Sequence, residues 1–455
     1  MDIRHIIMLQ KEFFATNKTK DVQFRLKKLH RLKSCIIQHE PEILAALKED
    51  LNKAEFESYA CEIGILLDEI NYLEKHLTQW CMPQKVKTPL TQFPSVSKIY
   101  SEPYGVVLII SPWNYPFMLS MQPLITAIAS GNCVVLKPSD YAPCTARVVK
   151  KIIEQVFAPN FAYVVLGGRE TNTALLAQKF DYIFFTGSPT VGKLVMQSAA
   201  KNLTPLSLEL GGKSPCIVDN TANIKLAAKR IAWGKFLNAG QTCVAPDYLY
   251  VHKDVKSELI NELKKSISKL YGDVPLYNDE LPKIINQKHF MRLVNLMKNE
   301  KVILGGQSDK VSEKIEPTLL ADVSWRSPVM QQEIFGPILP ILEFSELSDV
   351  IEIIKSKPKP LALYLFTQSA ENKNRVLNEI SFGGGCINDT VIHLATPYMP
   401  FGGVGNSGMG NYHGKFGFDT FSHKKSILKK SNLFDIPLRY APYKNKLTVL
   451  KKIMK

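Results

Sequence analysis

The sequence predicts an α/β fold of at least two domains, each built on a parallel sheet that helices cover. A chain of 455 residues is too long for one ordinary hydrophobic core, so two or three domains are expected. Short apolar runs alternate with helical stretches from residue 104 onward. Strands that are apolar on both faces are typical of a parallel sheet buried between helices.

These runs define two sheets. In the first half, strands are expected at 104–111, 132–139, 162–167 and 181–188, with crossover helices at 116–130, 143–157 and 189–201. In the second half, strands are expected at 214–219, 248–253 and 361–368, with a long helix at 222–239. The repeated pattern therefore predicts a second α/β domain.

Two segments lie outside these sheets. Residues 1–80 carry apolar side chains at three- and four-residue steps with charged side chains between them, which predicts amphipathic helices. Residues 82–103 combine prolines with alternating polar residues, which indicates extended strands or an arm.

Composition argues against several classes of protein. No apolar run reaches about 18 residues, so no membrane-spanning helix is expected. The N-terminal stretch lacks a long apolar region, and we expect no signal peptide. The eight cysteines form no CxxC pair, which argues against a zinc site or a disulfide framework. We therefore expect no metal and a reducing, cytoplasmic compartment.

The net charge of +15 favours anionic partners such as dinucleotides or acidic membranes. A well-solvated, lysine-rich surface is the simpler explanation of the same charge. Basic clusters are not interleaved with aromatic residues, so nucleic acid is not an expected partner.

Two short motifs point to a dinucleotide. In "DYIFFTGSPTVGK" a strand is followed by a turn containing Gly187 and Ser188 and by a helix that includes Gly192. Free amides and the dipole at a helix start attract phosphate, although an ordinary tight turn has the same pattern. In "LKPSD", Lys137 ends a strand where α/β sheets hold ligands, and its ammonium could donate to ribose hydroxyls. A solvated lysine is the alternative.

Four further residues stand out as candidates for covalent chemistry. Cys243 lies in the polar turn "NAGQTCVAPD", where a thiolate could attack a carbonyl carbon, although burial is the common fate of a cysteine. Glu209 and Glu333 are flanked by apolar residues, which raises the pKa of an acid and suits a general base. Asn114 follows a strand, and its amide could donate to an oxyanion. Structural roles explain the two acids and the amide as well.

A cysteine hydrolase would need a histidine beside its thiol. None of the nine histidines lies in these motifs, although residues distant in sequence, such as His393 or His413, could approach in the fold. A carboxylate base fits better, because it can direct water onto a thioester.

Taken together, these stretches resemble the aldehyde dehydrogenase superfamily, and specifically its class 3 and fatty-aldehyde branch. The resemblance runs from about residue 20 to about residue 443 and includes "SPWNYPF", "LKPS", "LSLELGGKSP", "SPVMQQEIFGP" and "MPFGGVGNSGMG". The motifs "GQTCVAPDY" and "HGKFGFDTFSHKK" favour the branch. The resemblance implies an aldehyde dehydrogenase-like α/β fold with a Rossmann-type cofactor domain, an α/β catalytic domain and a β oligomerisation arm.

The resemblance also implies roles for the catalytic residues. Cys243 would be the nucleophile, and Asn114 with the Cys243 backbone N–H would form the oxyanion hole. Hydride transfer to the cofactor would leave a thioester, onto which Glu209 would direct water. The implied substrates are medium- or long-chain aliphatic, or aromatic, aldehydes. An acylating dehydrogenase that transfers the acyl group to coenzyme A is the first alternative, and a non-catalytic structural or binding protein is the second.

For the cofactor, Gly187 and Ser188 would lie under the pyrophosphate and Lys137 would meet the adenosine ribose. Glu333 would hold the nicotinamide ribose, with Phe335 packed nearby. NAD is the expected cofactor.

One departure from the family leaves NADP open as well. Many members have glutamate where this chain has Asp140, and the shorter acid reaches the ribose less well. Gly192 would shape the helix start.

The expected domain boundaries follow from the same resemblance. Residues 1–81 and 104–210 would form the NAD(P)-binding domain, 211–395 the catalytic domain, 82–103 and 396–430 the oligomerisation arm, and 431–455 a basic tail. Class 3 members are dimers, and we expect a homodimer paired through the arm.

The tail itself suggests a further partner. Its residues 436–455 carry six Lys or Arg residues and no acid. A helix beginning at Lys444 would place apolar side chains on one side (Leu447, Val449, Leu450, Ile453 and Met454) and basic side chains on the other (Lys444, Lys451, Lys452 and Lys455), although Lys446 falls among the apolar positions. Such a helix could lie on an anionic membrane, and a frayed end or a helix packed on the partner subunit is the alternative.

Overall fold

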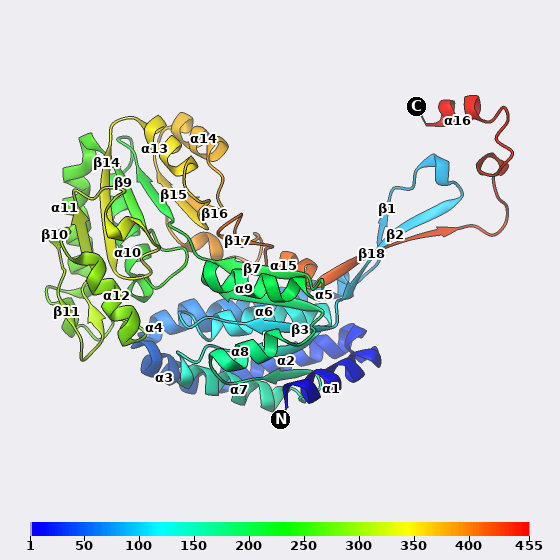
Figure 1. The fold of residues 1–455 in the computed structure, drawn as a ribbon, viewed down its shortest axis with the longest axis horizontal. Helices are drawn as coiled ribbons and strands as arrows, with labels where there is room; N and C mark the ends of the chain where they lie inside the picture. Colours follow the sequence, from blue (N-terminus) through cyan, green and yellow to red (C-terminus); the bar gives the residue numbers. More distant parts are fainter. Residues whose placement is uncertain (1, 455) are drawn as a thin grey trace.

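The computed structural model describes residues 2–454 and contains two α/β bodies and a projecting β arm. Figure 1 shows the first body, which is mainly blue, cyan and green, beside the second, which is mainly green and yellow. The arm extends away from both, and the C-terminus lies at its tip. The predicted fold class is confirmed.

The first body is built on a six-stranded sheet with the order β17-β7-β6-β3-β4-β5. Its strands are β3 (Val106–Ile110), β4 (Cys133–Lys137), β5 (Ala162–Val164), β6 (Tyr182–Gly187), β7 (Leu206–Leu210) and β17 (Gly408–Met409). All pairs are parallel except that of β17 with β7. The four strands expected in this half are confirmed, and every residue of β3 and β4 is buried.

Helices cover this sheet, and the helical prediction for the N-terminal region is confirmed. They are α1 (Ile3–Ala15), α2 (Val22–Gln38), α3 (Glu40–Leu51), α4 (Glu55–Ser58), α5 (Gly64–Trp80), α6 (Met118–Ser130), α7 (Pro143–Val156), α8 (Arg169–Leu176) and α9 (Pro189–Ala200). A π-helical turn, Tyr59–Ile63, joins α4 to α5. The side chain of Gln10 ties α1 to the sheet by donating to the Val134 carbonyl at 2.9 Å.

The second body is built on a seven-stranded sheet with the order β10-β13-β14-β9-β8-β15-β16. Its strands are β8 (Pro215–Val218), β9 (Tyr248–His252), β10 (Lys301–Leu304), β13 (Thr318–Ala321), β14 (Ile338–Phe344), β15 (Ala362–Phe366) and β16 (Gly384–Ile387). Only β10 is antiparallel to its neighbour. A small hairpin, β11 (Ser308–Asp309) and β12 (Lys314–Ile315), lies outside this sheet.

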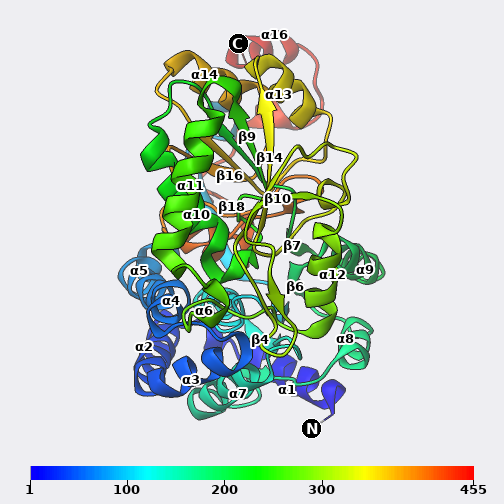
Figure 2. The same ribbon diagram turned by 90° about the vertical axis from the view of Figure 1, so that its left-hand side faces the viewer.

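The helices of the second body are α10 (Ile224–Phe236), α11 (Lys256–Tyr271), α12 (Gln287–Met297), α13 (Leu347–Lys355) and α14 (Ala370–Glu379). Figure 2 shows α10 and α11 side by side on the face of the sheet that is turned to the viewer. Helix α10 ends at Phe236, earlier than the expected residue 239. The reason is local, because Asn238 and Ala239 adopt the left-handed backbone conformation with φ of 52° and 51°.

The arm is a three-stranded antiparallel sheet of β1 (Gln84–Val86), β2 (Ser95–Pro103) and β18 (Ser422–Lys430). Residues 396–430 were expected to belong to it, but in the structure only β18 runs in this sheet. Strand β17 pairs with β7 of the first body instead. Helix α15 (Gly414–Thr420) contacts α5 and α6, and the Ser130 hydroxyl donates to the Phe418 carbonyl at 3.2 Å. These contacts hold 408–420 against the first body.

The basic tail forms a short helix, α16 (Leu447–Ile453), at the tip of the arm. Its apolar side chains Leu447, Leu450 and Ile453 line a groove together with Leu90 of the arm. Lys455, which was expected on the basic side, lies outside the described residues. Within residues 2–454, no helix has both the length and the apolar composition needed to cross a bilayer.

Candidate active site

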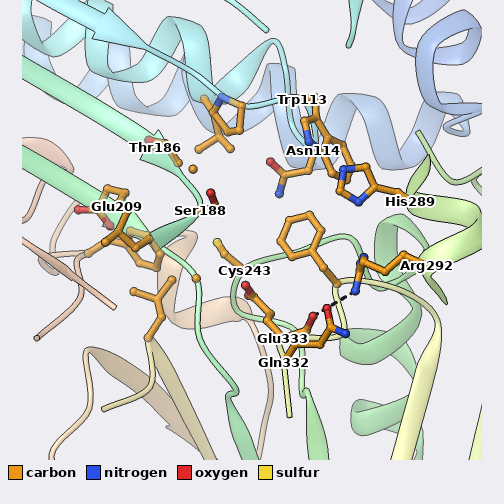
Figure 3. Close-up of a pocket in the computed structure, with 18 of the residues that line it drawn as sticks. Trp113, Asn114, Thr186, Ser188, Glu209, Cys243, His289, Arg292, Gln332 and Glu333 are labelled. Atoms are coloured by element: carbon orange, nitrogen blue, oxygen red, sulfur yellow. Dashed lines mark hydrogen bonds between the residues drawn. The ribbon is translucent and has the colours of Figure 1, made fainter. Parts of the chain in front are cut away.

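A cavity of about 240 Å³ lies between the two bodies, at the carboxyl ends of β3, β6 and β7. Seven of the predicted site residues line it: Asn114, Gly187, Ser188, Glu209, Cys243, Glu333 and Phe335. Figure 3 shows the Cys243 side chain near the centre of this cavity, with Glu209 on one side and His289 and Arg292 on the other. Segments far apart in the sequence therefore meet at one site, as α/β sheets favour.

Strand register accounts for part of this convergence. On the parallel pair β6–β7, Thr186 lies opposite Glu209 and Gly187 lies opposite Leu210. The glycine turn and the acid are therefore neighbours on one sheet edge, although more than twenty residues separate them in sequence. On the pair β3–β4, Ile110 lies opposite Lys137, which places the lysine at the same edge.

The turn after β6 opens helix α9 toward the cavity. Ser188 is the N-cap residue of α9, and its hydroxyl accepts from the Val191 N–H at 3.4 Å. Pro189 occupies the first turn and has no N–H to leave unpaired. A Cβ on Gly187 would lie 2.6 Å from the Phe185 ring, so a larger residue would require that ring to shift. The helix start has the geometry of a site for a diphosphate.

Lys137 and Gly192 do not line the cavity. Lys137 is 1% exposed, and its ammonium lies 3.8 Å from the Asp140 carboxylate. Burial lowers the pKa of Lys137, and Asp140 opposes that shift. Gly192 faces β7 within α9, where an added Cβ would meet Leu210 at 2.7 Å. Its small size therefore allows α9 to pack closely on β7.

The Cys243 loop owes its shape to the end of α10. After the left-handed Asn238 and Ala239, Gly240 has φ of 71°, and an added Cβ would lie 2.3 Å from the Gly336 carbonyl. The chain therefore turns sharply into Cys243. Burial, together with the charges of Glu333 and Glu209, raises the pKa of the Cys243 thiol to about 12. The thiol is thus protonated at neutral pH and needs a base before it can react.

Asn114 is held by this same loop. Its side-chain Nδ2 donates to the Gln241 carbonyl at 3.0 Å, and its own carbonyl accepts from the Asn238 side chain at 2.7 Å. The neighbouring Tyr115 hydroxyl lies 2.7 Å from the Thr242 hydroxyl. An amide nitrogen carries two hydrogens, so one N–H of Asn114 remains available to the cavity.

Two acids border the thiol. Glu209 is 3% exposed, and neither of its carboxylate oxygens has a hydrogen-bond partner among residues 2–454. Burial raises the pKa of Glu209 well above its usual range. Glu333 accepts from the Gly212 N–H at 3.2 Å, and burial with the Asp247 charge raises its pKa to about 8. An orphaned buried acid of raised pKa has the properties of a general base.

The lining residues to which the sequence analysis gave no role include Trp113, His289, Arg292 and Gln332. Arg292 of α12 donates to the Glu333 and Ile334 carbonyls at 3.3 and 2.7 Å. The Trp113 ring lies 5.3 Å from the Phe335 ring in an edge-to-face arrangement. Helix α12 carries no recognisable motif, so the sequence offered no signal for His289 or Arg292. Trp113 adjoins the candidate Asn114 and could have been included.

A second, apolar cavity of about 190 Å³ meets Cys243 from the other side. Its lining is almost entirely apolar and comes from α5 and its π-helical turn, α6, α10 and residues 391–413: Ala60, Cys61, Ile65, Tyr115, Met118, Leu119, Trp233, Leu237, Val391, Ile392, Leu394, Ala395, Phe401 and Tyr412, with Thr242 and His413. We call it the apolar tunnel. Cys243 lines both cavities, so its sulfur stands where they meet.

The two distant histidines of the sequence analysis do not supply a thiol base. Burial lowers the pKa of His393 to about 4 and that of His413 to about 3. The His413 ring stacks on Phe401 at 5.4 Å, and His393 lies 3.7 Å from the Cys386 sulfur. In the described part of the chain, no group of three or more His, Cys, Asp or Glu side chains is arranged to hold a metal ion.

Comparison with known proteins identifies the class. A family model described as the aldehyde dehydrogenase family matches residues 1–427. The chain belongs to the aldehyde dehydrogenase family and is an oxidoreductase that converts aldehydes to acids with NAD(P). This membership removes the non-catalytic alternative.

Several relatives are similar along nearly the whole chain. The 4,4'-diaponeurosporen-aldehyde dehydrogenase of Staphylococcus aureus is 50% identical over 447 residues, which cover 98% of this chain and 97% of that protein. The dimeric NADP-preferring aldehyde dehydrogenase of Mus musculus is 46% identical over 431 residues, covering 94% and 95%. A substrate-bound structure of Staphylococcus aureus AldH has a TM-score of 0.98 at 49% identity and covers 100% of both chains.

Proposed function

We propose that this protein oxidises medium- or long-chain aliphatic, or aromatic, aldehydes through a covalent intermediate on Cys243. One observation carries the proposal: the Cys243 sulfur stands between a cavity that the start of helix α9 borders and the apolar tunnel. The first suits a dinucleotide and the second suits an apolar chain. The aldehyde carbon would therefore meet the sulfur at the junction.

Attack begins with loss of the Cys243 proton to a neighbouring carboxylate. The thiolate then forms a C–S bond to the aldehyde carbon while the carbonyl electron pair moves to oxygen. The free N–H of Asn114 and the Cys243 backbone N–H stabilise the resulting oxyanion. A bound dinucleotide supplies the hydride acceptor, and a thioester on Cys243 is left. Gly187 and Ser188 are suited to its diphosphate, Lys137 and Glu333 to its riboses, and Phe335 to packing beside Glu333.

Glu209 completes the cycle. Its carboxylate takes a proton from water, the hydroxide oxygen adds to the thioester carbon, and the C–S bond breaks to release the acid. The proposal is supported by the unpartnered oxygens of Glu209, which leave its carboxylate free to accept a proton once it is ionised, and by its raised pKa, which makes that carboxylate a stronger base. Acyl transfer to coenzyme A remains the alternative, and a base directed at water argues against it.

Two further features are proposed on narrower grounds. The free thiols of all eight cysteines agree with a cytoplasmic location. Pairing of two chains through the arm is supported by two open sheet edges, because β18 ends the arm sheet and β16 ends the seven-stranded sheet. Unpaired edges are templates for strand addition, and a relative is named dimeric.

We predict that Glu209→Gln separates acylation from deacylation. The variant should release a first equivalent of NADH in a burst and then stall with a thioester on Cys243, because its base acts after hydride transfer. Rapid mixing and mass spectrometry of the Cys243 peptide test this, and Cys243→Ala, which should bind cofactor but show no burst, is the control. In the wild type, turnover should rise with pH as Glu209 loses its proton. Loss of the burst in Glu209→Gln would place Glu209 earlier in the mechanism.

The cofactor prediction concerns Asp140. Because this acid is one methylene shorter than the usual glutamate, a 2′-phosphate should be tolerated and NADP should support measurable activity. Asp140→Glu should shift the ratio of kcat/KM toward NAD, since the longer acid reaches the ribose and repels the phosphate. Initial rates with both cofactors decide the matter. If the wild type prefers NAD by more than about a thousandfold, roughly 4 kcal/mol, the prediction that NADP is tolerated is wrong.

The assembly prediction is a homodimer in solution. Ile427 and Leu428 of β18 are 42% and 46% exposed, which leaves apolar side chains beside an open edge. The double substitution Ile427→Glu and Leu428→Glu should shift the mass measured by light scattering from dimer toward monomer. Val311→Glu, at a position that is 94% exposed on the β11–β12 hairpin, is the matched control. A monomeric wild-type mass at micromolar concentration contradicts the proposal.

We also propose that the tail contacts anionic membranes reversibly. Deletion of residues 444–455 should reduce co-sedimentation with anionic vesicles, and added salt should do the same, because the tail is basic. Vesicles of zwitterionic lipid serve as the control. In the structure Leu447, Leu450 and Ile453 border a groove with Leu90 of the arm and remain 60%, 39% and 43% exposed. If the full-length protein does not co-sediment with anionic vesicles at low salt, the proposed membrane contact is wrong.

A further inference from the structure

A buried ion pair lies directly behind Asn114, outside both cavities. Lys53 and Glu62 are each 0% exposed, and the Lys53 ammonium contacts the Glu62 carboxylate. Neither residue belongs to the motifs of the sequence analysis. Isolated buried ion pairs often contribute little to stability, because desolvation offsets their attraction. Stability alone therefore does not explain why a buried ion pair lies beside Asn114.

Glu62 fixes the start of helix α6. One carboxylate oxygen is bound by Lys53, and the other accepts from the Phe117 N–H at 2.9 Å and the Met118 N–H at 3.2 Å. These are free donors of the first turn of α6, where a negative charge is also favoured by the helix dipole. Glu62 reaches them from the π-helical turn Tyr59–Ile63, an irregularity found mostly at functional sites.

Lys53 fixes the residues just before that helix. Its ammonium lies 3.4 Å from the Asn114 carbonyl oxygen and 4.2 Å from the centre of the Tyr115 ring. The first contact is a long hydrogen bond, and the second is a cation–π contact in a dry environment. The pair thus holds the whole segment from Asn114 to Met118 from behind.

The opposite side of this segment is held by the Cys243 loop. Asn238 donates to the same Asn114 carbonyl, and Asn114 donates to the Gln241 carbonyl. The preceding helix takes part here as well, because the Glu57 carboxylate accepts from the Asn238 N–H at 2.9 Å. Asn114 is therefore held on one side by Lys53, just before α4, and on the other side by the loop that carries Cys243.

We infer that Lys53 and Glu62 are positioning residues that set where the Asn114 amide stands relative to Cys243. This inference rests on the proposed oxyanion role of Asn114. A donor must lie within a few tenths of an ångström of its place to stabilise developing charge, and a shift near 1 Å can cost about 100-fold in rate. The pair acts on the rate of the step that generates the oxyanion and leaves cofactor binding alone.

The test compares burst rates of NADH formation in single and double variants. Lys53→Met should lower the burst rate by about 100-fold while the Kd for cofactor and the KM for aldehyde stay near wild type. Glu62→Gln is the milder variant, because its amide oxygen can still accept from the α6 amides. Lys53→Met combined with Glu62→Gln removes both charges, so an unpaired buried charge is not left to unfold the chain. Lys151→Met, which breaks the exposed pair with Glu42, is the matched control and should change nothing.

A double-mutant cycle with Asn114→Ala decides the mechanism. If the pair acts through Asn114, the loss caused by Lys53→Met or Glu62→Gln should nearly vanish in the Asn114→Ala background. An equal loss in both backgrounds overturns the inference and leaves the proposed function standing. An unchanged burst in Asn114→Ala alone overturns the oxyanion role, and the inference falls with it. Loss that tracks a lowered unfolding midpoint in every variant also overturns the positioning role.

Discussion

The active site depends on a small set of hydrogen bonds that join two loops from different α/β bodies. Asn114 and Tyr115 extend from the end of β3, and residues 238–243 follow α10. Three contacts link them: Asn114 to the Gln241 carbonyl, Asn238 to the Asn114 carbonyl, and Tyr115 to Thr242. All of these groups are buried, so each bond lies in a medium where breaking it is costly. The bonds therefore set the position of Cys243 relative to the Asn114 side chain.

The same region between the two bodies buries several ionisable groups away from water. Glu209, Glu333 and Cys243 have raised pKa values, and burial is the largest cause for each. Burial disfavours the charged form of each of these groups, so a ligand or a reaction intermediate that changes the local field would also change their protonation. Strongly perturbed pKa values of this kind cluster at functional sites.

Much of the fold was accessible from the sequence because it depends on local patterns. The stretches 104–111 and 181–188 identify buried strands, since each contains an uninterrupted apolar run, VVLII in the first and YIFF in the second. Strands such as β14 were missed because Pro340 interrupts the run, and β17 was missed because it is two residues long. The end of α10 was misplaced because the left-handed residues 238 and 239 are not glycines.

The sequence by itself determined the candidate chemistry of this protein. The neighbouring residues of a short motif were enough to single out each of the four candidates for covalent chemistry, Cys243, Glu209, Glu333 and Asn114. Only the tertiary structure decided which other residues surround these four. Arg292 and His289 come from a helix without a motif, Lys53 comes from the link between α3 and α4, and Glu62 comes from the π-helical turn after α4. The pairing of the strands and the packing of the two α/β bodies bring these groups together. Neither can be read from a short stretch of sequence, because contacts between distant segments depend on the packing of the whole chain.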